Sequence, residues 1–266
     1  MSTALSTLRR AALALGASVL LLTGGQASQP SVREGHLTVA AAADLKFALD
    51  DILKDFRSVR PDVDVQVTYG SSGNFVAQLS NGAPFDVFFS ADVEYVRQLR
   101  SKGLILVESE FIYAVGRIVL WVPRSSPLDP NQGLAVLRAP SVRRIAIANP
   151  RHAPYGRAAE AAMKSMKVYD GVRSKLVFGE NVAQAAQFVE SGAADAGIIA
   201  LSLASSPALT NEGRFWEIPL SAYPRMEQGG AVLKRTREPD AARALTAFVL
   251  GPSGRATLER FGFSLP

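Results

Sequence analysis

The stretch LTVAAAADLKFALDDILKDFRSVRPDVDVQVTY, residues 37–69, contains the unit that sets the fold of this 266-residue chain. Residues 37–42 form a short apolar run that predicts a buried strand, and an extended pattern resumes at residues 63–69. Between them, apolar side chains recur at the i, i+4, i+7 and i+8 spacing of one buried helical face: Leu45, Leu49, Ile52, Leu53 and Phe56. The order strand, helix, strand predicts an α/β fold with a largely parallel sheet.

The same unit recurs along the rest of the chain. A helix is expected to start at Ser72, and a third strand is expected at residues 85–89. After a proline- and serine-rich turn at residues 123–130, a second series of strands and helices follows. Its predicted elements are a strand at residues 145–148, a helix at 156–166, a strand at 176–178, a helix from Val182 and a strand at 194–200. The sequence therefore predicts two α/β lobes.

Residues 112–122 are strand-like and unusually long, as expected of a segment that crosses between two lobes, and Tyr113 to Gly116 are candidate hinge residues. Near the end of the chain, an extended segment at residues 231–233 and two helices, starting at Pro239 and Ser253, are expected to return to the first lobe. The predicted domains are lobe 1 at residues 28–114 plus 225–266 and lobe 2 at residues 115–224. Each lobe is expected to hold a mostly parallel sheet flanked by helices.

Residues 1–27 predict a secretory signal peptide. Arg9 and Arg10 precede an apolar run at residues 11–22, and the sequence Gly-Gln-Ala at residues 25–27 offers a small-x-small cleavage site. The apolar run is shorter than the roughly 20 residues that cross a bilayer, so a cleaved signal is favoured over a membrane anchor. We therefore predict that the chain is exported to the periplasm.

Composition narrows the function classes. With 48% hydrophobic and 20% charged residues, the chain has an ordinary globular composition. It contains no cysteine, which excludes disulfides, thiolate metal sites and cysteine nucleophiles. Removing Arg9 and Arg10 with the signal leaves 27 basic and 24 acidic residues, so the net charge falls from +5 to +3. The sequence contains no basic stripe of the kind that would indicate a nucleic-acid partner.

Three junctions between a predicted strand and the following helix carry residues suited to an anion: residues 70–74 (GSSGN), 149–156 (NPRHAPYG) and 179–182 (GENV). In open α/β sheets, ligands bind beyond the carboxyl ends of the strands, where helices present free N–H groups and the positive end of their dipole. Each junction also has a simpler explanation, because Ser72 and Asn181 could be helix caps and the middle junction could be an ordinary loop.

Motifs for catalysis are absent from the sequence. It holds no Gly-rich phosphate loop with a lysine, no G-x-S-x-G elbow and no histidines at metal-ligand spacing, since His36 and His152 are its only histidines. An exported serine hydrolase that uses Ser72 as nucleophile and His152 as base remains an alternative.

Several of these segments together resemble the periplasmic molybdate-binding proteins of ABC transporters. The resemblance covers nearly all of the chain after the signal, and its motifs follow one another in the family's order. They are VAAAADL at residues 39–45, YGSSGNF at 69–75, GAPFDVFFSAD at 82–92, NPRHAPYG at 149–156, GENV at 179–182, DAGII at 195–199 and RFGF at 260–263.

The resemblance implies a type II periplasmic binding protein with the ligand in the cleft between two lobes. Such a protein captures molybdate or tungstate and delivers it to the membrane permease of an ABC importer. It is not an enzyme, needs no cofactor, holds the metal only as an oxyanion without protein-metal ligands, and is expected to be a monomer. The alternatives are a receptor for another small anion, such as sulfate, phosphonate or an organic acid, and a module that has lost its ligand.

The resemblance also implies roles for individual residues. Ser72, beside Ser71, matches the family's oxyanion-binding serine, and Tyr155 and Val182 fall where the family supplies backbone N–H groups. Two further ligand positions depart from the pattern. Ala43 stands where the family commonly has a serine, and Ala200 where it often has a tyrosine.

Asp44, the residue after Ala43, raises a separate question, because its carboxylate carries the same sign of charge as the expected ligand. A carboxylate that faces a dianion in a shielded cleft is repelled by several kcal/mol at intermediate dielectric. Either Asp44 caps the helix that begins near Leu45, or it accepts a hydrogen bond from a protonated oxyanion or helps to bind a metal ion. A site of neutral donors would otherwise select a fully deprotonated dianion.

Overall fold

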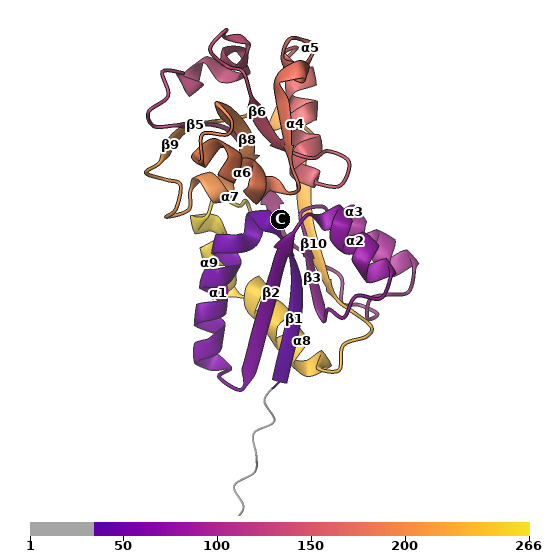
Figure 1. The fold of residues 1–266 in the computed structure, drawn as a ribbon. Helices are drawn as coiled ribbons and strands as arrows, with labels where there is room; N and C mark the ends of the chain where they lie inside the picture. The colour runs from indigo at the N-terminus through magenta and orange to yellow at the C-terminus, as the bar shows by residue number, and fades with distance from the viewer. Residues whose placement is uncertain (1–34) are drawn as a thin grey trace, which may run out of the picture. The chain divides into compact units, whose positions relative to one another are not determined.

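The computed structural model describes residues 35–266, whose strands form two five-stranded sheets (Figure 1). The predicted signal peptide at residues 1–27 lies outside the described residues. The first sheet has the order β2-β1-β3-β10-β4 and the second the order β7-β6-β8-β5-β9. The strands of the first sheet are β1 (Gly35–Ala42), β2 (Val63–Gly70), β3 (Val87–Ser90), β4 (Phe111–Gly116) and β10 (Met226–Val232). Those of the second are β5 (Ile118–Pro123), β6 (Ile145–Ala148), β7 (Leu176–Gly179), β8 (Ala196–Ala200) and β9 (Gly213–Glu217).

Both sheets are mixed in the same way. In the first, β1 pairs in parallel with β2 and β3, while β10 runs antiparallel to β3 and β4. In the second, β6 pairs in parallel with β7 and β8, while β5 runs antiparallel to β8 and β9. Four strands of each sheet therefore point in one direction and a single strand opposes them, as the prediction of mostly parallel sheets requires.

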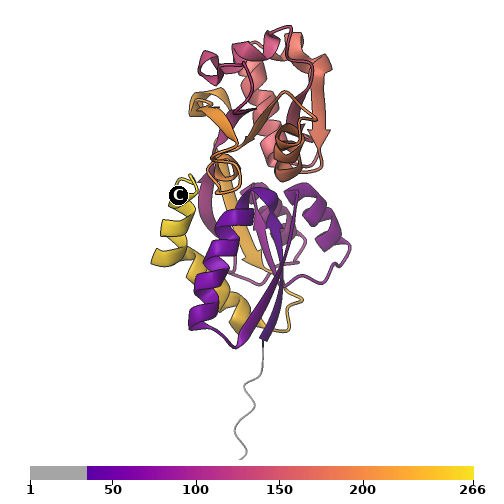
Figure 2. The same ribbon diagram turned by 60° about the vertical axis from the view of Figure 1, so that its left-hand side comes forward.

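Helices cover the sheets and connect their parallel strands (Figures 1 and 2). Around the first sheet lie α1 (Lys46–Val59), α2 (Ser72–Ser80), α3 (Val93–Ser101), α8 (Pro239–Leu250) and α9 (Pro252–Arg260), with the 3-10 turn η1 (Ala43–Leu45) before α1. The second sheet carries α4 (Pro154–Ser165), α5 (Tyr169–Val172), α6 (Val182–Glu190) and α7 (Leu201–Ala204), with the 3-10 segments η2 (Pro130–Arg138) and η3 (Arg173–Lys175); η4 (Leu220–Ala222) follows β9. We call each sheet with these helices a lobe.

Alternation along β1 produces two separate cores in the first lobe. Leu37, Val39 and Ala41 pack with α1, α8 and α9, whereas Ala40 packs with α2 and α3 on the opposite face of the sheet. Successive side chains of a strand point to opposite faces, so an uninterrupted apolar run fits a strand covered on both sides. The predicted apolar face of α1 is confirmed, because Leu49, Ile52, Leu53 and Phe56 are all buried.

The chain crosses from the first sheet to the second at Arg117, between β4 and β5. The prediction that residues 112–122 cross between the two lobes is confirmed, but the segment is two strands in different sheets rather than one long strand. Gly116 at the end of β4 has no room for a side chain: a Cβ there would lie 2.6 Å from both Gln228 Nε2 and Tyr155 Oη. The crossing is therefore packed directly against side chains from β10 and α4.

Further elements differ from the sequence-based expectations. Strand β9 was not predicted; it is an edge strand next to β5 whose side chains are mostly exposed, so it lacks an apolar signature. Strand β10 begins at Met226, five residues before the expected extended segment, and its pairing with β4 shifts register between Gln228 and Gly229. Such a bulge turns a side chain away from the regular pleat. Helix α4 begins at Pro154, where proline favours the first helical turn.

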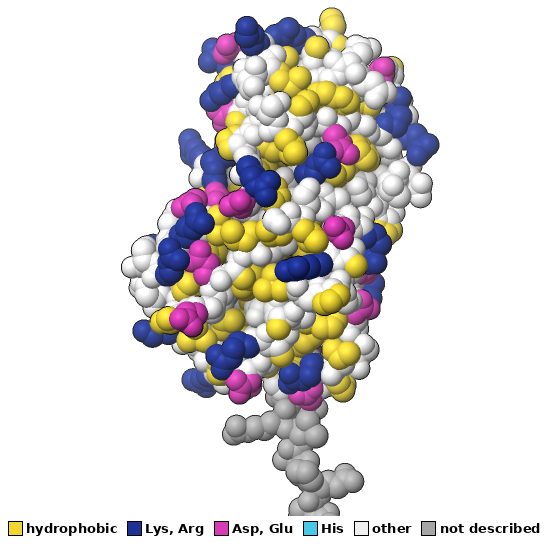
Figure 3. Space-filling view, turned by 180° about the vertical axis from the view of Figure 1, so that it is seen from behind, with side chains coloured by type: hydrophobic (Ala, Val, Ile, Leu, Met, Phe, Trp, Pro, Cys, Tyr) yellow, Lys and Arg dark blue, Asp and Glu magenta, His cyan; other side chains and the backbone are white. Residues whose placement is uncertain are grey.

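Within residues 35–266, none of the helices combines the length and apolarity needed to cross a membrane. On the face shown in Figure 3, Lys and Arg side chains are interspersed with Asp and Glu side chains and form no continuous basic stripe.

Gly156→Ala tests the close packing that fixes the start of α4. A Cβ at Gly156 would collide with the Ala148 carbonyl oxygen, which is backbone and cannot turn aside. We expect the free energy of unfolding to fall by about 1–3 kcal/mol, the usual cost of overpacking, in urea denaturation followed by circular dichroism. Gly171→Ala is the matched control, since the nearest atom to its added Cβ lies 3.6 Å away. An equal effect of both substitutions would contradict this account.

Candidate anion-binding site

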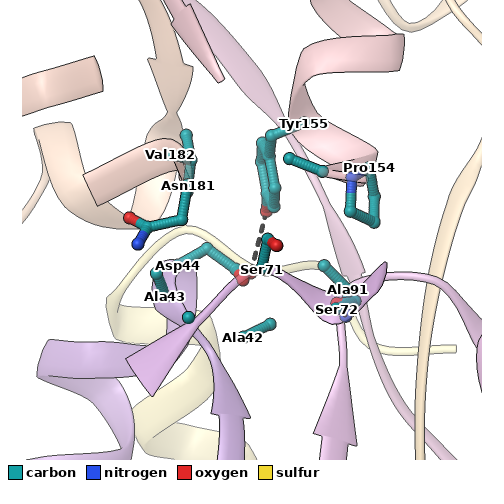
Figure 4. Close-up of a pocket in the computed structure, with 12 residues that line it drawn as sticks. Ala42, Ala43, Asp44, Ser71, Ser72, Ala91, Pro154, Tyr155, Asn181 and Val182 are labelled. Atoms are coloured by element: carbon teal, nitrogen blue, oxygen red, sulfur yellow. Dashed lines mark hydrogen bonds between the residues drawn. The ribbon is translucent and has the colours of Figure 1, made fainter. Parts of the chain in front are cut away.

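A small pocket lies where the ends of strands from both lobes meet the first turns of three helices (Figure 4). Its cavity volume is about 10 Å³, far below the roughly 300–1,000 Å³ of pockets that hold drug-sized molecules. The lining residues are Ala42, Ala43, Asp44, Gly70, Ser71, Ser72, Ala91, Ala153, Pro154, Tyr155, Asn181 and Val182. A pocket of this size suits an ion of a few atoms.

The first turn of α2 offers two donors to the pocket. Ser71 is the residue before the helix and makes no capping bond with its side chain, and Ser72 is the first helical residue. The Ser72 oxygen Oγ accepts a hydrogen bond from the Ala91 N–H at 3.0 Å, so its own hydrogen is free to be donated. In the described chain, no carbonyl accepts from the Ser72 N–H, whereas the Gly73 N–H is taken by the His152 carbonyl at 2.9 Å.

Helices α4 and α6 each add one N–H group. At the start of α4, Pro154 has no N–H, and Gly156 and Arg157 both donate to the Ala153 carbonyl. Among the N–H groups of this turn, only that of Tyr155 has no acceptor within residues 35–266. In α6, the Asn181 side chain caps the N–H groups of Ala183 and Gln184 at 3.0 Å.

Val182 is the first residue of α6. Its N–H, like that of Tyr155, has no hydrogen-bond acceptor among residues 35–266. Helix N-termini carry a partial positive charge and leave their first N–H groups unpaired. Three helices from two lobes thus bring donors without acceptors to one pocket. Within residues 35–266, no Lys or Arg side chain lines this pocket.

The Asp44 carboxyl group is buried at the edge of this pocket and is bonded across the lobes (Figure 4). Its Oδ2 accepts hydrogen bonds from the Tyr155 hydroxyl at 3.0 Å and from Gln228 Nε2 at 2.8 Å. The bulge in β10 accompanies this placement of Gln228, whose Oε1 accepts from the Tyr113 hydroxyl at 2.8 Å. On the other side, Ser202 donates to the Asp44 backbone carbonyl at 2.8 Å.

Burial changes the acidity of this network. Desolvation raises the pKa of Asp44 to about 6, although the hydrogen bonds from Gln228 and Tyr155 act in the opposite direction. Desolvation, with the nearby Asp44 charge, also raises the pKa of Tyr155 and Tyr113 well above the usual range, so both phenols stay protonated. The second carboxyl oxygen, Asp44 Oδ1, is buried without a hydrogen-bond partner among residues 35–266.

Polar contacts between the lobes surround the pocket. The Ser71 hydroxyl lies 2.9 Å from His152 Nδ1, and Asn74 donates to Glu180. Nearby, Arg157 of α4 forms an ion pair with Asp92 at 2.6 Å and donates to the Tyr95 hydroxyl at 2.9 Å. The two lobes are therefore in direct contact on the rim of the pocket.

Six of the seven residues singled out in the sequence line this one pocket: Ala43, Asp44, Ser71, Ser72, Tyr155 and Val182. Ala200 does not line it. It is fully buried at the end of β8, where it pairs with Ile118 and precedes α7. Pairing with β5 fixes this end of β8, and the Leu201 N–H that follows donates to the Arg117 carbonyl at the lobe crossing.

Two simpler explanations from the sequence are wrong. Neither Ser72 nor Asp44 acts as a helix cap, since α2 follows Ser71 and both η1 and α1 lack capping side chains. The cap interpretation of Asn181 is confirmed. The hydrolase pairing is also absent, because His152 faces Ser71 rather than Ser72.

Gln228 was not singled out in the sequence, and Tyr113 was predicted only as part of a hinge. Both are buried partners in the Asp44 network, at 0% and 1% exposure. A glutamine between Glu227 and two glycines, Gly229 and Gly230, was an available signal, since an amide that is buried needs partners. Its partners lie more than 70 residues away in sequence, so periodicity gives no indication of them.

Comparisons with known proteins agree with this architecture. A family model described as bacterial extracellular solute-binding protein matches residues 37–264. The molybdate-binding proteins of Azotobacter vinelandii and Rhodobacter capsulatus are 34% and 33% identical to the chain; the alignments cover 97% and 94% of this chain and 98% and 96% of those proteins. The solved structure of the periplasmic molybdate-binding protein of Azotobacter vinelandii superposes with a TM-score of 0.81 at 33% identity, covering 86% of this chain and 99% of that one. The superposition confirms the predicted fold class.

Asp44→Asn tests the cost of burying this carboxyl group. Its pKa of about 6 in the folded chain exceeds the ordinary value of 3.8, so the folded state binds more protons between these values and loses stability as the pH rises through them. Asparagine stays neutral. The variant should therefore be more stable than wild type by up to about 3 kcal/mol above pH 6, with the difference disappearing below about pH 4.

Urea denaturation between pH 4 and 8 measures this difference. Asp240→Asn is the control, because the Asp240 side chain is 95% exposed and should show no comparable trend. A stability difference between Asp44→Asn and wild type that does not change with pH would rule out the buried charge as its cause.

Proposed function

Because the chain belongs to the bacterial extracellular solute-binding protein family, we propose that its pocket captures molybdate or tungstate and that the protein delivers this anion to an ABC importer. The observation that carries the proposal is the convergence of three helix N-termini, each with an unclaimed donor, on one small pocket. The names of the relatives from Azotobacter vinelandii and Rhodobacter capsulatus support molybdate in particular. A solute-binding protein performs no catalysis, so the hydrolase alternative is dropped.

In this proposal the donors divide between the lobes. Ser72 contributes its hydroxyl and its N–H from the first lobe, and the N–H groups of Tyr155 and Val182 come from the second. Charge-assisted hydrogen bonds to an anion are roughly twice as strong as neutral ones, which compensates for the lack of a cation. Ser71 and Ala43 line the same space, Ala43 without a hydroxyl to offer, and Ala200 has no role in binding.

The donor set also favours a particular kind of anion. Hydroxyl and N–H groups satisfy the oxygens of a fully deprotonated tetrahedral anion, whereas a ligand that retains a proton needs an acceptor, and Asp44 is the one carboxylate among the lining residues. Molybdate and tungstate fit this requirement near neutral pH. Sulfate does as well, so its rejection must depend on the fit of the pocket to longer metal–oxygen bonds.

We further propose that the lobes move about the two chain crossings. The predicted boundaries, residues 28–114 plus 225–266 for lobe 1 and 115–224 for lobe 2, lie close to the crossing at Arg117 and to the segment between β9 and β10. A ligand that contacts both lobes would favour their closed arrangement over an open one. Export by the signal peptide, a periplasmic location, a monomeric state and docking to a membrane permease belong to the same proposal.

Calorimetric titration of residues 28–266 with molybdate, tungstate, sulfate and phosphate at pH 6.5 tests the function. We expect one-to-one binding of molybdate and tungstate and at least tenfold weaker binding of sulfate and phosphate. Failure of molybdate and tungstate to bind, together with tight binding of another anion, would overturn the proposed ligand and leave the family assignment intact.

Ser72→Ala tests the role of the pocket hydroxyl. Loss of a hydrogen bond to a charged ligand costs about 1.5–3 kcal/mol, so the Kd for molybdate should rise roughly 10- to 100-fold. Ser101→Ala is the matched control, since Ser101 is exposed and donates only to the Gln98 carbonyl of its own helix. Thermal unfolding of both variants checks that the loss of the bond to Ala91 has not unfolded the pocket. An unchanged Kd in folded Ser72→Ala would exclude this hydroxyl as a ligand donor.

A further inference from the structure

Asp44 is the one carboxylate among the residues that line the pocket, and its two oxygens have different surroundings. Oδ2 accepts two hydrogen bonds, from Tyr155 and Gln228. Oδ1 is buried and has no partner within the described residues. A buried acceptor left without a donor is costly, and one in a ligand pocket needs an explanation.

The side-chain donors that bond to Asp44 are engaged with Oδ2 or with one another. Gln228 Nε2 lies 2.8 Å from Asp44 Oδ2 and 3.0 Å from the Tyr155 hydroxyl oxygen, within hydrogen-bonding distance of both. The single hydroxyl hydrogen of Tyr155 is directed at Asp44 Oδ2. Tyr113 directs its hydrogen to Gln228 Oε1 or to the Ser90 carbonyl. Since Oδ2 accepts two hydrogen bonds and Oδ1 accepts none, Oδ1 is the oxygen better placed to carry a proton.

No positive charge among the described residues pairs with this carboxyl group. Tyr155 from α4 and Tyr113 from β4 are the titratable groups that face it, and β10 contributes the neutral Gln228. From α6 and α7 come an asparagine, a valine and a serine. On α1, the nearest charge along the sequence is Lys46, which lies 3.4 Å from Asp50.

A dianion in this pocket would meet a negative carboxylate in a region of low dielectric, where like charges repel strongly. Protonation of Asp44 removes the repulsion and also gives Oδ1 a hydrogen to donate. We propose that the pocket binds one proton together with each oxyanion, and that Asp44 Oδ1 carries this proton and donates it in a hydrogen bond to the ligand. The inference rests on the proposed function, because it requires an oxyanion in this pocket.

Two observations support this role over a metal site at the same carboxylate. Burial already raises the pKa of Asp44 to about 6, so the charge of a nearby dianion raises it further from a value that is already close to neutral pH. In addition, residues 35–266 contain no group of three or more His, Cys, Asp and Glu side chains that could hold a metal ion. Oδ1 thus lacks the companion ligands that a protein-bound cation requires.

Calorimetry in several buffers tests the proposal with the wild-type protein. Molybdate is titrated at pH 7.5 in PIPES, HEPES and Tris, whose ionisation enthalpies differ. The slope of the observed enthalpy against the buffer's ionisation enthalpy counts the protons taken up, and we expect close to one per molybdate. The Kd for molybdate should rise about tenfold per pH unit from pH 7 to 8 and level off below pH 6.

Variants locate the proton on Asp44. In Asp44→Asn the proton uptake should fall to zero and the Kd should become independent of pH, because the amide cannot titrate. Asp240→Asn, on the exposed surface, should retain the wild-type slope. Tyr155→Phe removes a hydrogen bond that favours the ionised carboxylate, so its pH profile should shift to higher pH.

The possible failures are distinguishable. Tight molybdate binding by the wild type with no proton uptake and no pH dependence would overturn this inference and leave the proposed function standing. Proton uptake that persists in Asp44→Asn would also overturn it, by placing the proton on another group. Absence of molybdate and tungstate binding throughout pH 6 to 8 would overturn the proposed function and this inference with it.

Discussion

An anion can be enclosed without a matching cation only where unpaired N–H and O–H groups converge on it, and this constraint organises the molecule. Regular helices consume their N–H groups internally except in the first turn, so the donors must come from helix N-termini. Parallel strands followed by helices place those N-termini at one edge of a sheet. Two such sheets, each interrupted by one antiparallel strand, bring α2 from the first lobe and α4 and α6 from the second to a common point. The apolar cores on both faces of the sheets fix the helices that carry these donors.

The buried polar network beside the pocket depends on the same crossing of the chain. Asp44, Gln228 and Tyr155 come from η1, β10 and α4, and they meet directly against Gly116, where the chain leaves the first sheet. A side chain at Gly116 would occupy the space of the network, and a regular β10 without its bulge would aim Gln228 elsewhere. Partly satisfied buried networks are unfavourable, so the free oxygen of Asp44 indicates function rather than stability.

Sequence reasoning succeeded where the physics is local and failed where it is not. The apolar face of α1 follows from a 3.6-residue period, and the three strand-to-helix junctions follow from residues that favour turns and helix starts, so both were predictable. The edge strand β9 has few buried side chains and therefore no pattern to detect. A helix cap was one of the roles left open for Asp44, because that role is common for an aspartate before a helix; its distant partners on β10 and α4 override that preference. The position of Ala200 outside the pocket likewise depends on pairing with β5, which only the folded sheet determines.

The first turn of α2 links ligand capture to contact between the lobes. Two neighbouring N–H groups of this turn have different roles. That of Ser72 is available to the pocket, and that of Gly73 donates to the His152 carbonyl of the opposite lobe. Gly73 must be glycine for this approach, because a Cβ there would lie 2.6 Å from the same carbonyl oxygen. The loop that supplies His152 continues into Tyr155, whose N–H is a proposed ligand donor. An anion that binds the Ser72 and Tyr155 groups would therefore hold together the two segments that already touch at Gly73. Ligand binding and lobe contact are then coupled through one helical turn and one loop.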